Sequence, residues 1–320
     1  MIYSKIIATG SALPQTMITN DNLNKTLNIS HEWITRRTGI KQRHIAVKNI
    51  KTSDLATLAL HNALNKCLVK PNDLDGIILA TTTPDRVFPS TAITVQNNIK
   101  MTSGFAFDVQ AACSGFLYAL QIADIFIRQQ KYRKIAIIGA DVMSKIVDWN
   151  DKNTCVLFGD GAGAIILGAI HNNKNQGILG TEIYSDGSFI NILKVSEQML
   201  GRSKQKKILM DGQEVFKNAI IKMKEAIIHL LNNHDKNIQD IDFLLLHQAN
   251  SKIIKAVARK LGLNQKKILS SVQYHANTSA ASIPLCLDEH LKKQSLVKGS
   301  LIITAAAGAG LTWGTALFYI

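Results

Sequence analysis

Cys113 lies in the stretch FDVQAACSGFLYAL (107–120), after an apolar run and before an apolar segment, with small residues on both sides. The pattern predicts a strand, a tight corner and a helix, with the thiol at the corner. The free N–H groups and the dipole of a helix that begins there favour the thiolate, which is the nucleophilic form. Cysteine is also commonly a small buried hydrophobe. This stretch by itself therefore supports a packing role and a catalytic role for Cys113 equally.

Two further polar side chains follow apolar or small-residue runs late in the chain. In LLLHQAN (244–250), His247 comes directly after three leucines. An imidazole at a strand end can act as a general acid or base, or donate a hydrogen bond to an oxygen. In NTSAAS (277–282), Asn277 precedes a run of small residues. Asparagine in such a place commonly caps a helix, but its amide can also polarise a carbonyl. The neighbouring His275 is interpreted as structural or exposed.

A glycine-rich segment, AAAGAGLTWG (305–314), follows near the C-terminus. Such loops present backbone N–H groups to anions or oxyanions, although a plain tight turn is the alternative. The segment lacks the GxxxxGK[ST] pattern, and its glycines precede a predicted strand, so it is not a nucleotide-binding fingerprint. A cysteine nucleophile, a histidine, an asparagine and an oxyanion loop together indicate acyl transfer through a thioester.

The chain repeats itself, and this repeat determines where the candidate residues lie. Four segments recur in the same order with offsets near 165 residues for the first three. The matched pairs are NDLDGIILATTTPD (72–85) with QDIDFLLLHQANSK (239–252), FDVQAACSGFLYAL (107–120) with SSVQYHANTSAASIPLCL (270–287), RKIAIIGAD (133–141) with GSLIITAAA (299–307), and FGDGAGAIILG (158–168) with GAGLTWGTALFYI (308–320). The repeat predicts two halves, residues 1–172 with the cysteine and residues 173–320 with the histidine and asparagine.

The elements around these corners predict a layered α/β architecture. The strands are short and continuously apolar, and residues 54–68 and 214–233 show apolar residues at helical spacing. Strands buried on both faces require helices on both faces. Two packed halves therefore predict a five-layer αβαβα fold, in which a pseudo-twofold axis brings equivalent corners into one site.

Composition limits the other classes of function. The 320 residues are 46% hydrophobic and 19% charged, with a net charge of +14. Such a charge invites nucleic acid, an anionic membrane or an acidic protein as partner. The lysines are scattered, apart from GRSKQKK (201–207), and no aromatic residues alternate with them, so nucleic acid is a weak interpretation. A basic interaction protein without catalysis is the alternative outside enzymes, and intact Cys113, His247 and Asn277 argue against it.

Cysteine spacing and hydropathy bear on metals, compartment and membranes. The four cysteines form no CxxC pair and no zinc-like cluster, so we expect no metal site and a reducing cytoplasm. Residues 299–320 carry no charge and have the length of a bilayer span. Glycines at 308, 310 and 314 interrupt the segment, so we expect two buried strands joined by a loop and no membrane insertion.

The motifs in combination resemble the thiolase-fold condensing enzymes and, within them, the β-ketoacyl-[acyl-carrier-protein] synthase III family. The resemblance runs almost from end to end and rests on IIATGSALP, EWITRRTGI, FPS, FDVQAACSGF, FGDGAGA, DGQEVFK, HQAN, NTSAAS and LTWG. It implies that a short acyl-CoA, acetyl-CoA foremost, condenses with malonyl-[acyl-carrier protein], with loss of CO2, to initiate type II fatty acid synthesis. It also implies a cytoplasmic homodimer that needs no cofactor besides the acyl-CoA substrate.

The resemblance assigns catalytic roles to the candidate residues. Cys113 would carry the acyl group, and His247 and Asn277 would complete a Cys-His-Asn triad. The backbone N–H groups of Cys113 and Ala309 would form the oxyanion hole. Elongating synthases pair cysteine with two histidines, and the similar plant polyketide enzymes are longer chains, so NTSAAS and the length favour the initiating type. Relatives that hydrolyse thioesters or make secondary metabolites remain the alternative within the same fold.

The resemblance also implies binding residues for coenzyme A. Trp33 and Arg37 match residues that hold its adenine end, and Asn250 matches a residue of the pantetheine tunnel. Two positions depart from the family pattern. Ile29 stands where threonine is common, and Lys152 stands where an arginine commonly stacks on adenine. Because lysine is a point charge that stacks poorly, we expect a weaker grip on coenzyme A.

Two surface roles complete the expectations from the resemblance. Phe88 matches an aromatic residue that shapes the acyl pocket across a dimer interface. The resemblance also implies basic residues that bind the acidic carrier protein. The net charge of +14 would then serve binding of this protein partner, and not of nucleic acid. These basic residues are Lys217, Lys252, Arg259 and Lys260.

Overall fold

Short apolar runs pair into two five-stranded mixed sheets in the computed structural model, which describes residues 2–171, 176–196 and 207–320. The first sheet has the order β1-β7-β6-β4-β5, with the first two pairings antiparallel and the last two parallel. Its strands are β1 (Tyr3–Ala12), β4 (Gly76–Ala80), β5 (Phe105–Val109), β6 (Lys134–Val142) and β7 (Asp160–Ile170).

The second sheet repeats this arrangement. It has the order β8-β14-β13-β11-β12, again with two antiparallel and then two parallel pairings. Its strands are β8 (Gly177–Ser185), β11 (Phe243–Leu246), β12 (Ile268–Leu269), β13 (Leu301–Gly308) and β14 (Thr312–Tyr319). The matching order and direction confirm the predicted duplicated α/β fold.

The register of the repeat is sharper in the structure than in the sequence. β4 and β11 begin at 76 and 243, and β6 and β13 begin at 134 and 301. The short 3-10 turns before the two central helices, η2 (Ala112–Ser114) and η7 (Ser279–Ala281), begin at 112 and 279. Each pair is separated by 167 residues, so one offset relates the strand ends and the corners of the two halves.

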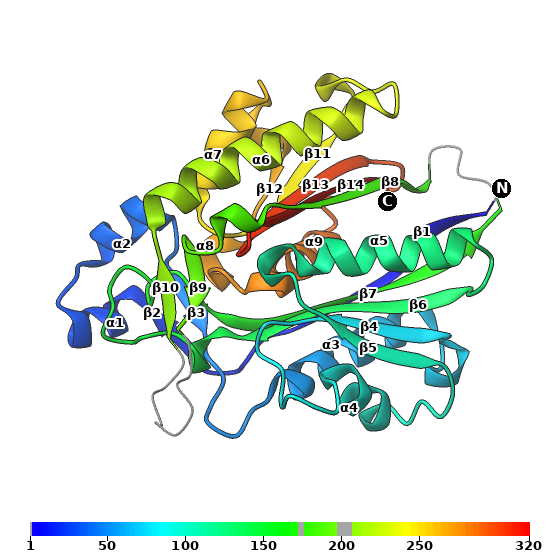
Figure 1. Ribbon diagram of the computed structural model, residues 1–320, viewed down its shortest axis with the longest axis horizontal. Coiled ribbons are helices and arrows are strands. Elements are labelled where there is room, and N and C mark those ends of the chain that lie inside the picture. The colour runs from blue at the N-terminus through cyan, green and yellow to red at the C-terminus, as the bar shows by residue number, and fades with distance from the viewer. Residues whose placement is uncertain (1, 172–175, 197–206) are drawn as a thin grey trace.

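Helices form three layers around the two sheets (Figure 1). α5 and α9 lie in the middle and contact both sheets, α3 and α4 cover the first sheet, and α6 and α7 cover the second. The predicted helices at 54–68 and 214–233 correspond to α3 and α6. The bounds are α3 (Thr52–Cys67), α4 (Thr91–Asn98), α5 (Gly115–Arg128), α6 (Gly212–Asn232), α7 (Ser251–Lys260), α8 (Val272–His275) and α9 (Ser282–Lys292).

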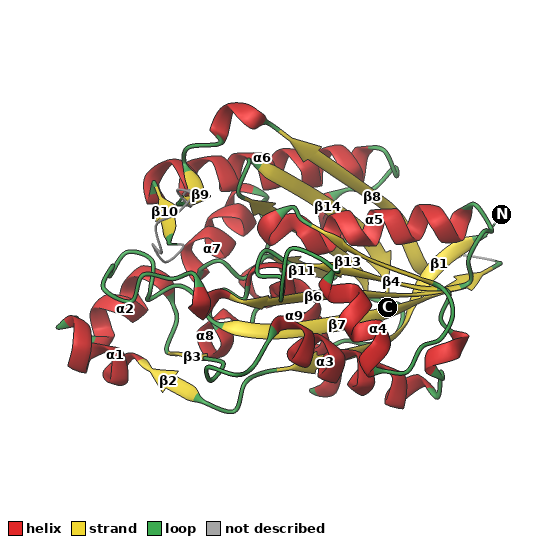
Figure 2. Ribbon diagram, turned by 60° about the horizontal axis from the view of Figure 1, so that its bottom comes forward, coloured by secondary structure: helices red, strands yellow, loops and turns green. Residues whose placement is uncertain are grey.

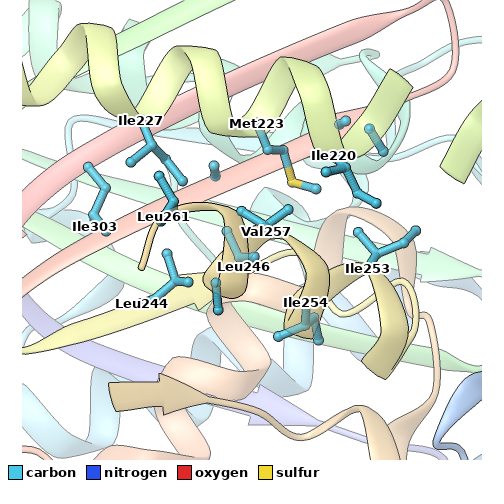
Figure 3. Packing of buried hydrophobic residues seen from close by; sticks show 14 of the residues in the cluster. Ile220, Met223, Ile227, Leu244, Leu246, Ile253, Ile254, Val257, Leu261 and Ile303 are labelled. Atoms are coloured by element: carbon cyan, nitrogen blue, oxygen red, sulfur yellow. The ribbon is translucent and has the colours of Figure 1, made fainter. Parts of the chain in front are cut away.

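The outer layer of the second half shows why these segments fold as they do. Ile220, Met223 and Ile227 on α6 point toward α7 and the sheet (Figure 3). Their spacing of three and four residues places them on one helix face. Leu244 and Leu246 on β11 complete this apolar layer. Because this face is apolar, α6 packs against β13, β14 and α7.

Smaller elements gather at one end of the molecule, beside the α2 helix (Figures 1 and 2). β2 pairs with β3, and β9 pairs with β10, each antiparallel. Their bounds are β2 (Met17–Thr19), α1 (Asn20–Leu27), α2 (His31–Thr38), β3 (Gln42–His44), β9 (Leu193–Val195) and β10 (Ile208–Met210). These elements carry several of the residues expected to bind coenzyme A.

The uncharged C-terminal segment 299–320 folds as two strands of the second sheet. The uncharged segment 299–320 forms β13 and β14, which pair antiparallel, so the expectation of two buried strands is confirmed. Within residues 2–171, 176–196 and 207–320, no helix has the length and apolarity needed to cross a membrane. The predicted boundary at 172/173 and all but the last residue of the lysine-rich run 201–207 lie outside the described residues.

Candidate active site

Cys113 lies in the turn between β5 and α5, as the sequence predicted. Cys113 is the middle residue of the 3-10 turn η2, which leads directly into α5 at Gly115. Ala112 has a φ of 46°, a left-handed conformation that non-glycine residues rarely adopt and that is common where a fold holds functional groups. Only 8% of Cys113 is exposed.

The burial of Cys113 affects the pKa of its thiol. Burial raises the pKa of the thiol to about 12, and the neighbouring Ser279 hydroxyl only partly opposes this rise. A buried thiolate loses the solvation of its charge, and this loss is the largest cause of the raised pKa. Burial at this corner therefore opposes the ionisation that a helix start is expected to favour.

His247 follows β11 directly, and its ring is held on one side. The backbone N–H of His247 donates to the Ala305 carbonyl at 2.9 Å, which extends the pairing of β11 with β13. Ring atom Nδ1 lies 2.6 Å from Oγ of Ser282. Burial, with 3% of the residue exposed, lowers the pKa of His247 to about 4. The imidazole is therefore neutral at pH 7, and it can donate or accept one proton at Nε2 depending on its tautomer.

Asn277 is fixed by both its backbone and its side chain. Its N–H donates to the Leu157 carbonyl at 2.9 Å, and its own carbonyl accepts from the N–H of Gly159 at 3.0 Å. Its side-chain oxygen accepts from the N–H of Ser279 at 2.8 Å. This bond closes a local turn and is not the helix cap of the simpler interpretation, because Thr278 occupies the N-cap position of η7. The same bond leaves the NH2 group as the free, donating end of the amide.

One cavity joins the three predicted triad residues. Cys113, His247 and Asn277 all line it, although they come from three separate corners of the duplicated fold. Asn250 lines the same cavity, and its side-chain oxygen accepts from the N–H of Ile253 at the start of α7. The remaining lining is mostly apolar and includes Leu157, Phe158, Leu193, Met210, Val215, Phe216, Ala219, Met223, Ala249 and Ile253.

Cys113 also lines a second cavity of about 480 Å³, and this one contains Ala309. The glycine loop therefore meets the cysteine corner, as predicted. Gly308 explains how closely they approach, because a Cβ at this position would lie 2.7 Å from the backbone nitrogen of Cys113. The Thr312 hydroxyl donates to the carbonyls of Ala309 and Ala111 at 3.0 and 2.9 Å. The loop is thus tied to the turn that carries the thiol.

A buried carboxylate, Asp141, organises the region between the corners. One oxygen accepts from the hydroxyls of Thr81, Thr82 and Thr83 and from the N–H groups of Thr82 and Thr83, at 2.7–3.1 Å. The other accepts from the N–H of Ala280 at 3.3 Å. Asp141 therefore joins the segment after β4 to the turn that follows Asn277.

The residues expected to hold coenzyme A lie at the end formed by α1, α2 and the short strands. The Arg37 guanidinium lies over the indole ring of Trp33, 4.4 Å from its centroid. Ile29 is buried, and Lys152 is exposed in the turn before Cys155. Arg37 is therefore stacked on an aromatic ring, and Lys152 shows no comparable stacking in the described residues.

Phe88 and the basic residues lie on the surface. Phe88 is 82% exposed and is not among the residues that line either cavity of its own chain. Lys252 and Arg259 line a groove on α7, together with Lys255 and Phe216. The other two predicted docking residues are exposed outside that lining, and they are Lys217, which pairs with Glu214 at 3.7 Å, and Lys260.

Several site residues were not found from the sequence. Ser279 and Ser282 lie within NTSAAS, and Gln248 lies within HQAN, so the motifs contained them without showing their contacts. Asp141 ends an apolar strand, which was a usable signal for a buried carboxylate. Nearby, the ring of His275 pairs with Glu289 at 2.8 Å, in agreement with its structural interpretation.

Comparison with known proteins identifies the family. The family described as 3-oxoacyl-[acyl-carrier-protein (ACP)] synthase III matches residues 107–187, and its C-terminal part matches residues 231–320. The β-ketoacyl-[acyl-carrier-protein] synthase III of Ehrlichia canis (strain Jake) is 49% identical over 320 residues, which cover 100% of both chains. The chain belongs to the β-ketoacyl-[acyl-carrier-protein] synthase III family.

Solved structures agree with this assignment. The 3-oxoacyl-[acyl-carrier-protein] synthase III from Aquifex aeolicus VF5 superposes with a TM-score of 0.93 at 43% identity, covering 99% of this chain and 100% of that one. The priming β-ketosynthase from the R1128 polyketide biosynthetic pathway gives 0.94 at 26% identity, covering 99% and 96%. The predicted family, the thiolase-like fold and the class of condensing acyltransferase are confirmed.

Proposed function

We propose that this member of the β-ketoacyl-[acyl-carrier-protein] synthase III family condenses a short acyl-CoA, acetyl-CoA foremost, with malonyl-[acyl-carrier protein], through an acyl group on Cys113. The observation that carries the proposal is the position of Cys113 between two cavities. One cavity holds His247 and Asn277, and the other holds Ala309. A nucleophile placed in this way has donors for one substrate on one side and room for an acyl chain on the other.

In the first half-reaction, Sγ of Cys113 attacks the thioester carbonyl of acyl-CoA. The backbone N–H groups of Cys113 and Ala309 stabilise the tetrahedral oxyanion. The carbon–sulfur bond to coenzyme A then breaks, and the proton that left the Cys113 thiol ends on the sulfur of coenzyme A. Acyl-Cys113 and free coenzyme A result, as expected for ping-pong kinetics.

In the second half-reaction, malonyl-[acyl-carrier protein] places its thioester carbonyl near Nε2 of His247 and the NH2 group of Asn277. Both groups donate hydrogen bonds to that oxygen as CO2 leaves, so the electron pair of the broken bond is stabilised as an enolate. The enolate carbon attacks acyl-Cys113, and the Cys113 thiolate is released. That thiolate takes one proton from solvent, and 3-oxoacyl-[acyl-carrier protein] leaves.

Trp33, Arg37, Lys152 and Asn250 bind coenzyme A in this proposal. The stacked Trp33–Arg37 pair offers an aromatic face and a cation at 4.4 Å, groups suited to a base and a phosphate. Asn250 lies in the apolar cavity that leads to Cys113, as a pantetheine arm requires. No other cofactor enters the reaction.

A second copy of the chain supplies Phe88 to the acyl pocket. β5 is the edge strand of its sheet, and exposed Val87, Phe88 and Ile93 lie in the segment and helix before it. An unpaired sheet edge beside large exposed apolar side chains is typical of a homodimer interface. The four free cysteines fit a reducing cytoplasm as the compartment.

The groove on α7 receives the carrier protein. Lys252, Lys255 and Arg259 line it beside the apolar side chain of Phe216. Lys217 and Lys260 extend the positive charge around it. Such a surface complements an acidic partner and accelerates its binding.

A panel of acyl-CoA primers tests the proposed function. Each primer is incubated with the protein, acylation of Cys113 is measured, and malonyl-[acyl-carrier protein] is then added. We expect acylation by acetyl-CoA followed by a 3-oxoacyl product on the carrier protein. Hydrolysis of the primer, or product formed from malonyl-CoA instead, would contradict the proposal and favour a thioesterase or a secondary-metabolism enzyme.

A further inference from the structure

The hydroxyl of Ser282 holds the side of the His247 ring that carries Nδ1. Oγ of Ser282 and Nδ1 of His247 are 2.6 Å apart. The residues are 2% and 3% exposed, so water does not compete strongly for this bond. Ser282 is the first residue of α9, which packs against β11 and so faces the strand end that carries His247.

The direction of this hydrogen bond follows from the other partner of Ser282. A serine hydroxyl has one proton to donate and two lone pairs that accept. The backbone N–H of Gln248 donates to Oγ at 3.3 Å, and an N–H group can only donate. Within the described part of the chain, Nδ1 of His247 is thus the one acceptor among the hydroxyl's hydrogen-bond partners. Because a buried proton without an acceptor is costly, the hydroxyl donates to Nδ1.

We propose that Ser282 is a positioning residue that fixes His247 in the tautomer with its proton on Nε2. Burial keeps the ring neutral at pH 7, so it carries one proton, and an Nδ1 that accepts leaves this proton on Nε2. Nε2 is the ring nitrogen on the side away from Ser282, and His247 lines the cavity with Asn277. Ser282 thereby gives His247 the donating form that decarboxylation needs.

Residues 279–282 orient both proposed donor side chains, Asn277 and His247. Ser279 donates its N–H to the side-chain oxygen of Asn277 and leaves the NH2 group free. Ser282, three residues later, donates to Nδ1 of His247 and leaves Nε2–H free. In the first half of the chain, the residue 167 positions before Ser282 is Gly115, which has no side chain that could serve this purpose. The hydroxyl is therefore present only in the half whose strand end carries the histidine.

The tautomer itself is measured first, in the wild-type protein. Long-range proton–nitrogen correlation on protein labelled with 15N-histidine distinguishes Nε2–H from Nδ1–H, and a His247→Gln variant assigns the signal. We expect an unprotonated Nδ1 and a protonated Nε2 at pH 7. A His247 signal with the proton on Nδ1 would overturn the proposal. This measurement needs no turnover, so it is separate from any failure of the proposed function, on which the catalytic role of Ser282 rests.

Kinetics of Ser282 variants form the second test. In Ser282→Ala we expect the rate of condensation to fall about tenfold, below the ~10²–10³ cost of removing such a donor outright, with acylation of Cys113 by acetyl-CoA unchanged. Ser282→Thr keeps the hydroxyl and is expected to restore condensation and the Nε2–H tautomer. Ser4→Ala is the matched control, because Ser4 is a buried serine bonded to Asp124 at 2.5 Å outside the site.

Two results from these variants would contradict the positioning role. The first is an equal fall in acylation and condensation in Ser282→Ala, which indicates a merely structural effect. The second is a Ser282→Ala protein that keeps both its Nε2–H signal and its full condensation rate. If Ser282→Ala does not fold, the wild-type tautomer and the Ser282→Thr variant still decide the question.

Discussion

The two halves of this enzyme share one topology, but the proposed mechanism assigns them different chemical roles. At the common offset of 167 residues, Cys113 corresponds to Ala280, His247 to Ala80, and Asn277 to Gln110. In the proposed mechanism, the first half supplies the nucleophile and the second supplies both donors, from positions that are not symmetric equivalents. Duplication provided two similar corners at the centre, and later divergence gave each corner a different task.

The corners are also reciprocal in their packing. Gly308 in the second sheet allows the backbone of Cys113 to approach, and Gly139 in the first sheet allows the turn after Asn277 to approach. A Cβ would lie 2.7 Å from the nitrogen of Cys113 at position 308 and 2.2 Å from the carbonyl oxygen of Ala280 at position 139. Each half therefore holds the reactive corner of the other, and this explains how the two cavities meet at one thiol.

The largest expected effect is a difference in condensation rate between variants of Asn277 and of its counterpart Gln110. In Asn277→Ala we expect condensation to fall by ~10²–10³, because a preorganised donor to the enolate oxygen is lost. Gln110→Ala is expected to cost less than about tenfold, since its amide lies outside the cavity of the donors. Single-turnover condensation with acyl-enzyme measures both losses. Equal losses in the two variants would show that the halves do not divide the roles as described.

Acylation should respond differently, and it forms the control for the same variants. We expect Asn277→Ala to accept the acetyl group on Cys113 at nearly the wild-type rate, because its amide acts on the second substrate. If acylation fell as much as condensation, separate roles for the Cys113 thiol and the donor side chains would be contradicted.

The two glycines are expected to affect opposite half-reactions. Gly308→Ala pushes on the Cys113 nitrogen and should slow acylation by about 10²-fold, because a displacement of 1 Å in a site has roughly that cost. Gly139→Ala pushes on the turn after Asn277 and should slow condensation more than acylation. Measured rates of both half-reactions test this pattern. If both variants slow the same step, the reciprocal packing does not control the chemistry.

A buried ionic cluster between the halves is expected to make stability depend on pH. Asp288 on α9 accepts hydrogen bonds from Thr9 and Ser11 on β1 and from Lys66 on α3, at 2.5–2.7 Å. Burial opposes the ionisation of Asp288, but Lys292, Lys66 and these hydroxyls outweigh it and lower its pKa to about 2. This stabilisation of about 2 kcal/mol is present above pH ~4 and is lost as the pH falls toward 2.

Asp288→Asn tests that cluster. We expect it to lower the free energy of unfolding by about 2 kcal/mol at pH 7 and by clearly less near pH 3, measured by urea denaturation. The exposed Asp21, whose pair with His31 is 3.9 Å long, provides the control variant Asp21→Asn, with an effect within about 0.5 kcal/mol. A loss for Asp288→Asn that is the same at both pH values would contradict the assigned protonation.

The smallest expected effect lies on the surface of the second half. Reversing the charges of Lys252 and Arg259 to glutamate should raise the KM for malonyl-[acyl-carrier protein] about tenfold and leave acylation by acetyl-CoA unchanged. The effect should shrink at high salt, because exposed charges are screened. Lys298→Glu, exposed in the turn before β13 and not among the predicted docking residues, is the matched control. An equal rise in KM for the control would place the carrier protein elsewhere on the surface.

Much of the fold was predictable because the repeat and the apolar runs are local signals. The apolar runs predicted strands that end just before His247 and at the glycine loop. Small residues predicted the corner at Cys113. The contacts of Ser279, Ser282 and Asp141 were not, because they join residues that the sequence separates by up to 139 positions. The raised pKa of the Cys113 thiol was not predicted for the same reason, since the burial of this thiol depends on both halves together.

The proposed mechanism requires Cys113 to carry the acyl group between the two half-reactions. Radiolabelled acetyl-CoA is added without malonyl-[acyl-carrier protein], the protein is digested, and the labelled peptide is identified by mass spectrometry. We expect one acetyl group per chain, on the peptide that contains Cys113, and no label in Cys113→Ala. Label on Cys67, Cys155 or Cys286, or product formed from malonyl-[acyl-carrier protein] without any acylated cysteine, would contradict it.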